Sequence, residues 1–140
     1  MTAIAQKAPS RAQIQSLEAH LAQMPQLEIT TRHHFAKGLY AREIVIPAGT
    51  ILTGKVHAEE HLNIVSKGRI AVWTEDGMRE VSAPFTMVSR PGTKRVGLAI
   101  EETVWTTIHA NPTDDTDLAL LEAKLIEPEA IGVDAHEVLQ

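Results

Sequence analysis

The middle of the chain constrains the fold most, because residues 39–110 hold a series of short β-type segments with turn signals between them. The segment LYAREIVI alternates and ends in a Pro-Ala-Gly turn, and HLNIVSKG is a second β-rich segment. In RIAVWTEDGMREVSA, Asp76-Gly77 is a strong signal for a two-residue hairpin loop. A Pro-Gly turn follows FTMVS, and TVWTTIHA is the last such segment. Short strands at close intervals, with no helix between them, predict an all-β antiparallel sandwich or barrel.

Two short helices are expected to flank this β region. Ser10 is a candidate N-cap for the first helix, which ends at Pro25. Its apolar residues recur at helical spacing, at Ile14, Leu17, Leu21 and Met24. The second helix has Asp117 as its candidate N-cap and ends before Pro128, and the residues expected on its apolar face are Leu118, Leu121 and Leu125. We therefore expect an N-terminal extension with a short helix over residues 1–28, a barrel over 29–112, and a C-terminal helix and tail over 113–140.

Composition removes several function classes. The chain has no cysteine, which excludes disulfides, thiolate metal ligands and cysteine nucleophiles. The formal net charge is -5, and lysines and arginines are scattered, so attraction to nucleic acid or anionic lipid is not expected. No apolar stretch has the length of a signal peptide core or a membrane span. We expect a cytoplasmic protein without nucleic-acid or membrane partners.

Two histidines four residues apart, His57 and His61, lie in the stretch GTILTGKVHAEEHLNIVSKG. The helical zinc-protease motif needs Glu directly after its first His, whereas Ala58 follows His57 and the flanks are strand-like, so that motif is excluded. On a straight strand the two Cα atoms would be roughly 13 Å apart, which is too far for two ligands that bind one metal at about 2.0–2.1 Å. Binding of one metal therefore requires a turn over residues 58–60, with His57 closing one strand and His61 opening the next.

The same stretch resembles the first conserved motif of the cupin superfamily, in which a Gly is followed by His-x-His, then Glu, then Gly at fixed spacing. Gly49, His57 and Gly68 stand at the matching positions. Lys55 stands where the motif has its first His, and His61 stands where it has Glu. The resemblance implies a single cupin-like antiparallel β-barrel, or jelly roll, between the two helices.

The second cupin motif is less complete. In SRPGTKRVG, Arg95 stands at the position of its histidine. The whole resemblance covers residues 35–111, and the chain also looks like small stand-alone cupins of phage and bacterial genomes. A homodimer is expected, because cupin-like barrels often pair through sheet edges or swapped strands.

Our functional hypothesis is a site in which His57, His61 and His109 bind one metal ion in the barrel mouth. Strand alternation places His109 on the same face as Trp105 and Thr107, but leaves open whether that face is inward. Three neutral imidazoles suit Zn²⁺, Fe²⁺, Ni²⁺ or Cu²⁺ and leave a position open for water or substrate. The alternative is that His57 and His61 are surface turn residues and His109 is a hydrogen-bonded structural residue.

The neighbouring residues suggest how a substrate would be held. Glu59 or Glu60 is a candidate general base. Lys55 and Arg95 are candidates to bind an anionic substrate, and Trp105 is a candidate aromatic wall. In the adjacent pair His33-His34, at most one side chain can face the site, because neighbouring strand residues point to opposite faces.

Three function classes stay open. The first is a metal-dependent enzyme, by resemblance an oxygenase, isomerase or lyase, acting on a small polar or acidic molecule. The second is a barrel that binds or sequesters a small anion without chemistry, through Lys55, Arg69, Lys94 and Arg95. The third is a structural or partner-binding domain that forms homo-oligomers.

Overall fold

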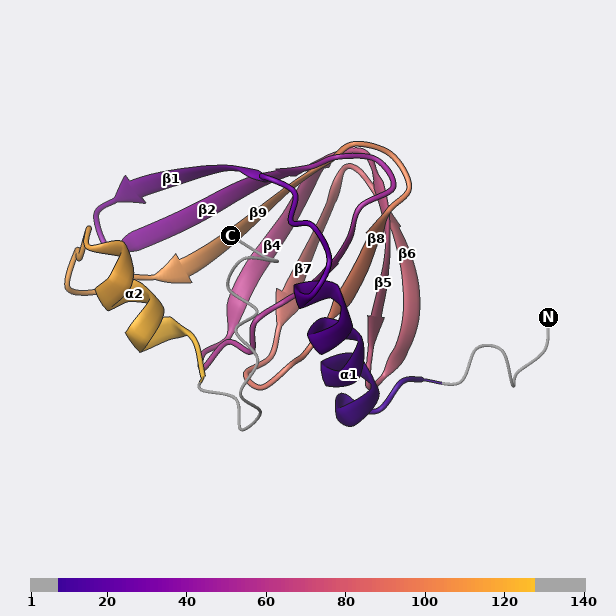
Figure 1. Cartoon of the computed structure of the whole chain (residues 1–140). Coiled ribbons are helices and arrows are strands. Elements are labelled where there is room, and N and C mark those ends of the chain that lie inside the picture. Colours follow the sequence, from indigo (N-terminus) through magenta and orange to yellow (C-terminus); the bar gives the residue numbers. More distant parts are fainter. Residues whose placement is uncertain (1–7, 128–140) are drawn as a thin grey trace.

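The computed structural model describes residues 8–127, in which strands lie between two short helices (Figure 1). The helices are α1 (Arg11–Ala22) and α2 (Leu118–Leu125). The strands are β1 (Thr30–Ala36), β2 (Leu39–Ile46), β3 (Ile51–Thr53), β4 (His61–Lys67), β5 (Arg69–Thr74), β6 (Gly77–Ser82), β7 (Phe85–Ser89), β8 (Val96–Ala99) and β9 (Thr103–Ala110). No helix in this part of the chain is long and apolar enough to cross a membrane.

The strands form two antiparallel sheets that face each other as the walls of a barrel (Figure 1). One sheet has the order β1-β2-β9-β4-β7 and the other the order β3-β8-β5-β6. Neighbours in each sheet are mostly distant in sequence, as in a jelly roll. The predicted all-β jelly-roll barrel with flanking helices is confirmed.

The hairpin between β5 and β6 forms where the sequence places it, but its loop lies one residue earlier than predicted. Thr74 pairs with Gly77, so the two loop residues are Glu75 and Asp76. Gly77 instead opens β6 with a φ of 126°, a conformation that residues with a Cβ rarely adopt. The glycine therefore marks the end of the turn and not its centre.

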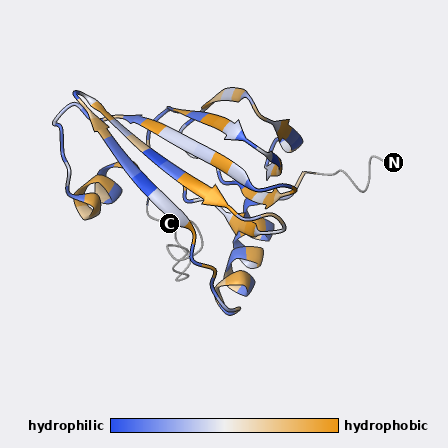
Figure 2. Cartoon of the chain, turned by 90° about the horizontal axis from the view of Figure 1, so that it is seen from above, coloured by the Kyte–Doolittle hydropathy of each residue, from blue (hydrophilic) through white to orange (hydrophobic). Residues whose placement is uncertain are grey.

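The core lies between the sheets, and strand alternation decides which side chains enter it. In β4, His61, Asn63 and Val65 are buried while Leu62 is exposed. Bands of hydrophobic and hydrophilic residues accordingly succeed one another along the strands (Figure 2). The aliphatic centre consists of Ile44, Ile46, Leu52, Val65, Ile70, Val72, Val81 and Ala99. Two polar residues near the start of β4, His61 and Asn63, thus point inward and form part of the candidate site.

Both helices begin at the predicted N-caps. The Ser10 hydroxyl accepts from the Gln13 amide at 3.1 Å, and the Gln13 side chain accepts from the Ser10 amide at 2.8 Å, which completes a capping box. The Asp117 carboxylate accepts from the amides of the first turn of α2. Helix α1 lies against β3, and α2 packs on Tyr40 at the end of the five-stranded sheet.

The packed face of α2 is narrower than predicted. Leu121 and Leu125 are buried against Tyr40, as expected. Leu118 lies on the same face, since it lines the outer side of the barrel together with Leu121 and Leu125, but it is 45% exposed. Only the later part of this face is therefore buried.

Candidate metal centre

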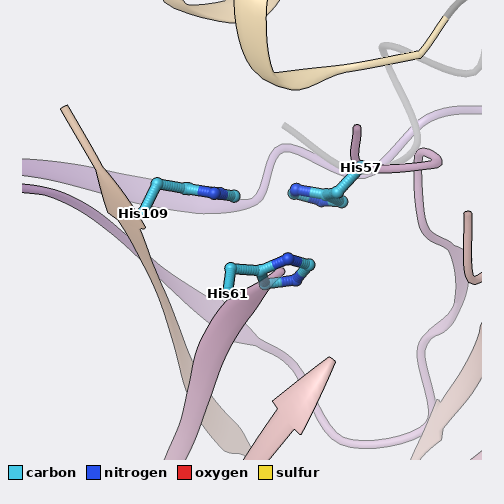
Figure 3. Close-up of side chains that lie close together, drawn as sticks. All are labelled: His57, His61 and His109. Carbon is cyan, nitrogen blue, oxygen red and sulfur yellow. The ribbon is translucent and has the colours of Figure 1, made fainter. Parts of the chain in front are cut away.

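Three histidines from separate parts of the fold meet at the open end of the barrel (Figure 3). His61 opens β4, His109 lies one residue before the end of β9, and His57 lies in the connection between β3 and β4. One ring nitrogen from each histidine lies within 4.8 Å of the others. His61 and His109 are 5% and 4% exposed, and the face of β9 that carries His109 is therefore inward.

The chain turns between His57 and His61, as one shared metal requires. The centroids of their rings are 4.2 Å apart, far closer than a straight strand would allow. His61 opens a strand as predicted, but His57 does not close one, because β3 already ends at Thr53. His57 instead forms an isolated antiparallel bridge with Ile126, directly after α2.

Backbone hydrogen bonds hold the His57 segment in place. The Ala58 amide donates to the Leu125 carbonyl at 2.8 Å, and the Glu127 amide donates to the Val56 carbonyl at 2.7 Å. The Gly92 amide donates to the His57 carbonyl at 3.0 Å. The residues at and directly after the end of α2 therefore pair with the His57 segment as a neighbouring strand would.

All three imidazoles are neutral at neutral pH. Burial lowers the pKa of His57 to about 2, and the positive charges that His61, His109 and Arg95 would present lower it further. Burial, followed by His61, lowers the pKa of His109 to about 4. Burial also lowers the pKa of His61, although its hydrogen bond to the Glu59 backbone acts in the opposite direction. Neutral imidazole is the form that binds metals.

The unpaired nitrogens of these rings fit a metal ion. His57 Nδ1, His61 Nε2 and His109 Nδ1 are buried and have no hydrogen-bond partner among the described residues. His61 Nδ1 lies 3.0 Å from the Glu59 carbonyl, which can only accept, so the proton sits on Nδ1 and the lone pair on Nε2. Such a second contact fixes the tautomer and orientation of a metal-binding histidine. Leaving three buried ring nitrogens without partners is costly, and one metal ion would bind all three in the tautomers that leave a lone pair on each.

Two cavities adjoin the histidines. The inner cavity, of about 60 Å³, lies inside the barrel and is lined by Arg42, His57, Arg95 and Trp105 together with aliphatic side chains. The outer cavity, of about 360 Å³, lies between the barrel and α2 and is lined by His57 and His109 among others. His57 borders both cavities, so a ligand in either would lie beside the histidines.

The structure brings some of the predicted substrate residues to the site. Arg95 and Trp105 line the inner cavity, with the guanidinium carbon 6.0 Å from the centre of the indole ring. Lys55 borders both cavities, but its ammonium forms an ion pair with Glu122 of α2.

The acidic turn contributes differently from what was expected. The side chains of Glu59 and Glu60 are exposed, and it is the Glu59 backbone carbonyl that contacts His61. A role for either carboxylate as general base stays a prediction.

The four-residue anion set proposed from the sequence does not form one group. Lys94 is fully buried and pairs with Glu18 of α1. Arg69 lies at the surface beside Glu80 and Glu101. Including these two residues was wrong, because each already neutralises a carboxylate elsewhere.

Sequence reasoning missed Arg42, which lines both cavities. A signal for it existed in LYAREIVI, where alternation puts Arg42 on the same face as the buried residues Tyr40, Ile44 and Ile46. A cation on the inward face of an apolar strand is unusual and points to a site. Of the two adjacent histidines, His33 faces the outer cavity and contacts the Tyr40 hydroxyl at 2.7 Å, while His34 pairs with Glu43 at the surface.

No family model and no curated protein matches the sequence. Solved structures resemble the chain in fold. The ectoine synthase of P. lautus is 11% identical with a TM-score of 0.57, over 78% of this chain and 83% of that one. A salicylate 1,2-dioxygenase from Pseudaminobacter salicylatoxidans is 12% identical with a TM-score of 0.56, over 79% of this chain and 33% of that one. A cupin superfamily protein from Desulfitobacterium hafniense is 8% identical with a TM-score of 0.52, over 74% of this chain and 94% of that one. Fold and strand order together establish that the chain has the jelly-roll fold of the cupins.

Proposed function

We propose that the protein binds one divalent transition metal ion through His57, His61 and His109 and is a metal-dependent enzyme that acts on a small polar or acidic molecule. The observation that carries this proposal is the convergence of three neutral imidazoles, two buried and one half-buried, each with one buried nitrogen that lacks a partner among the described residues. Enzymes occur among the solved structures of this fold, including the salicylate dioxygenase.

An ion held there would supply a Lewis acid with a position open to a ligand, and an all-imidazole donor set suits Zn²⁺, Fe²⁺, Ni²⁺ or Cu²⁺. The residues of the chain would do the rest. The Glu59 carbonyl holds the His61 ring with its Nε2 toward the other two histidines. Aliphatic side chains give the inner cavity beside His57 an apolar wall. Arg95 and Trp105 would orient the substrate from below, and Lys55 holds α2 over the outer cavity through Glu122.

The test is elemental analysis of the untagged protein after loading with each metal and removal of the excess. We expect about one equivalent per chain in the wild type, and less than a tenth of that after His57→Asn or His61→Asn. His34→Asn is the matched control, because it removes an exposed histidine outside the cluster. Absence of metal from the loaded wild type, or full metal content in the His57→Asn variant, would refute the proposal.

A further inference from the structure

Positively charged side chains line the inner cavity. Arg42, Lys55 and Arg95 line it, and among residues 8–127 no carboxylate does. Lys55 is neutralised by Glu122 on the far side, toward the outer cavity. Glu122 also attracts Arg42 electrostatically, so Arg95 is the cation of this lining whose contacts among the described residues include no carboxylate.

Arg95 makes only neutral contacts among the described residues. Its Nη2 donates to the Ser89 hydroxyl, and its guanidinium lies over the ring of Trp105. Burial lowers the pKa of Arg95 to about 10, which still leaves it charged at neutral pH. A guanidinium has five N–H donors in a planar fork, and one hydroxyl satisfies one of them. The remaining donors border a cavity that contains no protein acceptor of opposite charge.

A rigid polar network fixes the Arg95 fork. Ser89 Oγ also accepts from Asn63 Nδ2 at 2.6 Å, and Asn63 Oδ1 accepts from Trp105 Nε1 at 2.9 Å. Thr107 Oγ1 donates to the same Asn63 oxygen at 3.2 Å. These residues come from β4, β7 and β9, so the network joins three adjacent strands beneath the cavity. Arg95 is thereby preorganised, which reduces the entropy lost when a ligand binds.

We propose that the inner cavity is a binding site for the carboxylate of a small organic acid, held by Arg95, with its short apolar body against Trp105 and the aliphatic lining. The proposal deepens the proposed function and rests on the same site, since it assigns the substrate class. A planar carboxylate matches the guanidinium fork with two parallel hydrogen bonds. A volume of about 60 Å³ limits the acid to a few carbon atoms. The other end of such a ligand would lie beside His57.

The experiment titrates the ¹⁵N-labelled, metal-free protein with sodium propionate and follows the indole N–H signals. The chain has two tryptophans, so the spectrum provides one reporter in the site, Trp105, and one internal control, Trp73 on β5. 1-Propanol and propylammonium chloride serve as neutral and cationic probes of the same size. We expect a saturable shift of the Trp105 signal with propionate alone, and no shift of Trp73.

Variants test whether the Arg95 guanidinium is responsible for the binding of propionate. Arg95→Met should raise the Kd for propionate at least about tenfold, as expected for loss of a charge-assisted pair. Arg69→Met removes the same charge at the surface and should leave the Kd unchanged. If Arg95→Met does not fold, Ser89→Ala tests the same fork, and we expect it to weaken binding of propionate severalfold.

The proposal is overturned if propionate gives no saturable shift, if 1-propanol binds equally well, or if Arg95→Met and Ser89→Ala both leave the Kd unchanged. Saturation by inorganic phosphate but not by propionate would also overturn it, because the site would then select an inorganic anion. Since the titration uses metal-free protein, its failure is distinct from a failure of the metal analysis. Propionate binding in a chain that takes up no metal would support this site and refute the metal centre.

Discussion

The three histidines are individually unusual because the fold keeps each ring neutral and leaves one of its nitrogens without a partner among the described residues. In the unfolded chain each has a pKa near 6.5, whereas in the folded, metal-free protein the pKa of His57 is about 2 and that of His109 about 4. Above pH 6.5 both states carry neutral rings and these residues do not affect the pH dependence of stability. Below pH 6.5 the histidines of the unfolded chain become protonated, whereas His57 and His109 of the folded protein stay neutral until the pH approaches their lowered pKa values.

We therefore predict that the metal-free protein loses stability as the pH falls from 6.5 toward 4. Each of the two histidines contributes a slope of up to about 1.4 kcal/mol per pH unit in the free energy of unfolding. Urea unfolding at a series of pH values in the presence of chelator measures the slope. His57→Asn/His109→Asn should flatten it, and His34→Asn should not. An equal slope in the double variant would show that other groups cause the acid sensitivity.

Gly68, the last glycine of the cupin-like motif, is required by the turn between β4 and β5. It has a φ of +88°, and a Cβ there would lie 2.1 Å from the Glu102 carbonyl oxygen. Gly38 is a matched control, since its φ is +75° and a Cβ there would meet nothing within 4 Å. Gly38→Ala should cost only about 1–2 kcal/mol, the strain of a left-handed residue. Gly68→Ala should cost clearly more in the same urea unfolding assay, and equal losses would contradict the steric argument.

Whether a part of the site could be predicted depended on how far apart its residues lie along the sequence. The cluster of three histidines was predicted because His57 and His61 sit in a motif of fixed spacing, and His109 because it lies near the end of a clear strand. The Arg95–Ser89–Asn63–Trp105 network was not found. Its members come from β4, β7, the connection before β8, and β9, and nothing in the order of residues indicates that these segments adjoin.

The helices show the same limit at the scale of elements. The N-cap of α1 was predictable from local pattern, because capping involves residues three apart. Its end was not, since the helix stops at Ala22, and Met24, placed on its apolar face, lies beyond it and is exposed. The burial of Glu18 was not, because its partner Lys94 is 76 residues away. On its own, Glu18 is a normal residue of a polar helix face. In the fold it is 1% exposed, and its carboxylate accepts from Lys94 and from Thr53, each at 2.7 Å.

This buried ion pair anchors α1 to the barrel, and removing one partner should be costly. We predict that Lys94→Met lowers the free energy of unfolding by about 3–5 kcal/mol, because Glu18 is left buried without its counter-ion. The double variant Glu18→Leu/Lys94→Met should recover much of the loss. The pair between Arg11 of α1 and Glu75 of the loop between β5 and β6, which is much more exposed, is the control, and Arg11→Met should cost less than about 1 kcal/mol. Urea unfolding gives all three values, and a loss below 1 kcal/mol for Lys94→Met would contradict the prediction.

At the scale of the whole molecule, the homodimer expected from the sequence stays a prediction. The mass of one chain is 15.3 kDa, so sedimentation equilibrium should give about twice that value at micromolar concentrations. A single species at the mass of one chain, over the whole accessible concentration range, would contradict it.

A bound metal would connect parts of the molecule that are otherwise joined only by the sheet. Its ligands come from β4 and β9, which adjoin in the five-stranded sheet, and from the connection after β3, which the end of α2 holds in place. Opening any of these segments separates the ligands, so the metal should stabilise the whole fold and not a local loop. Metal that binds only the folded state adds about 4.1 kcal/mol when its free concentration is a thousand times the Kd.

We therefore predict that Zn²⁺ raises the Tm of the wild type by several degrees, that chelator reverses the rise, and that the unfolding transition remains single. Thermal unfolding monitored by circular dichroism measures the change. His57→Asn should abolish the rise although its own metal-free Tm stays close to that of the wild type, since His57 is only half-buried and its buried Nδ1 has no hydrogen-bond partner among the described residues. His34→Asn should respond to Zn²⁺ as the wild type does. If Zn²⁺ raises the Tm of the His57→Asn variant equally, the stabilising ion binds elsewhere, and the three histidines are a structural cluster.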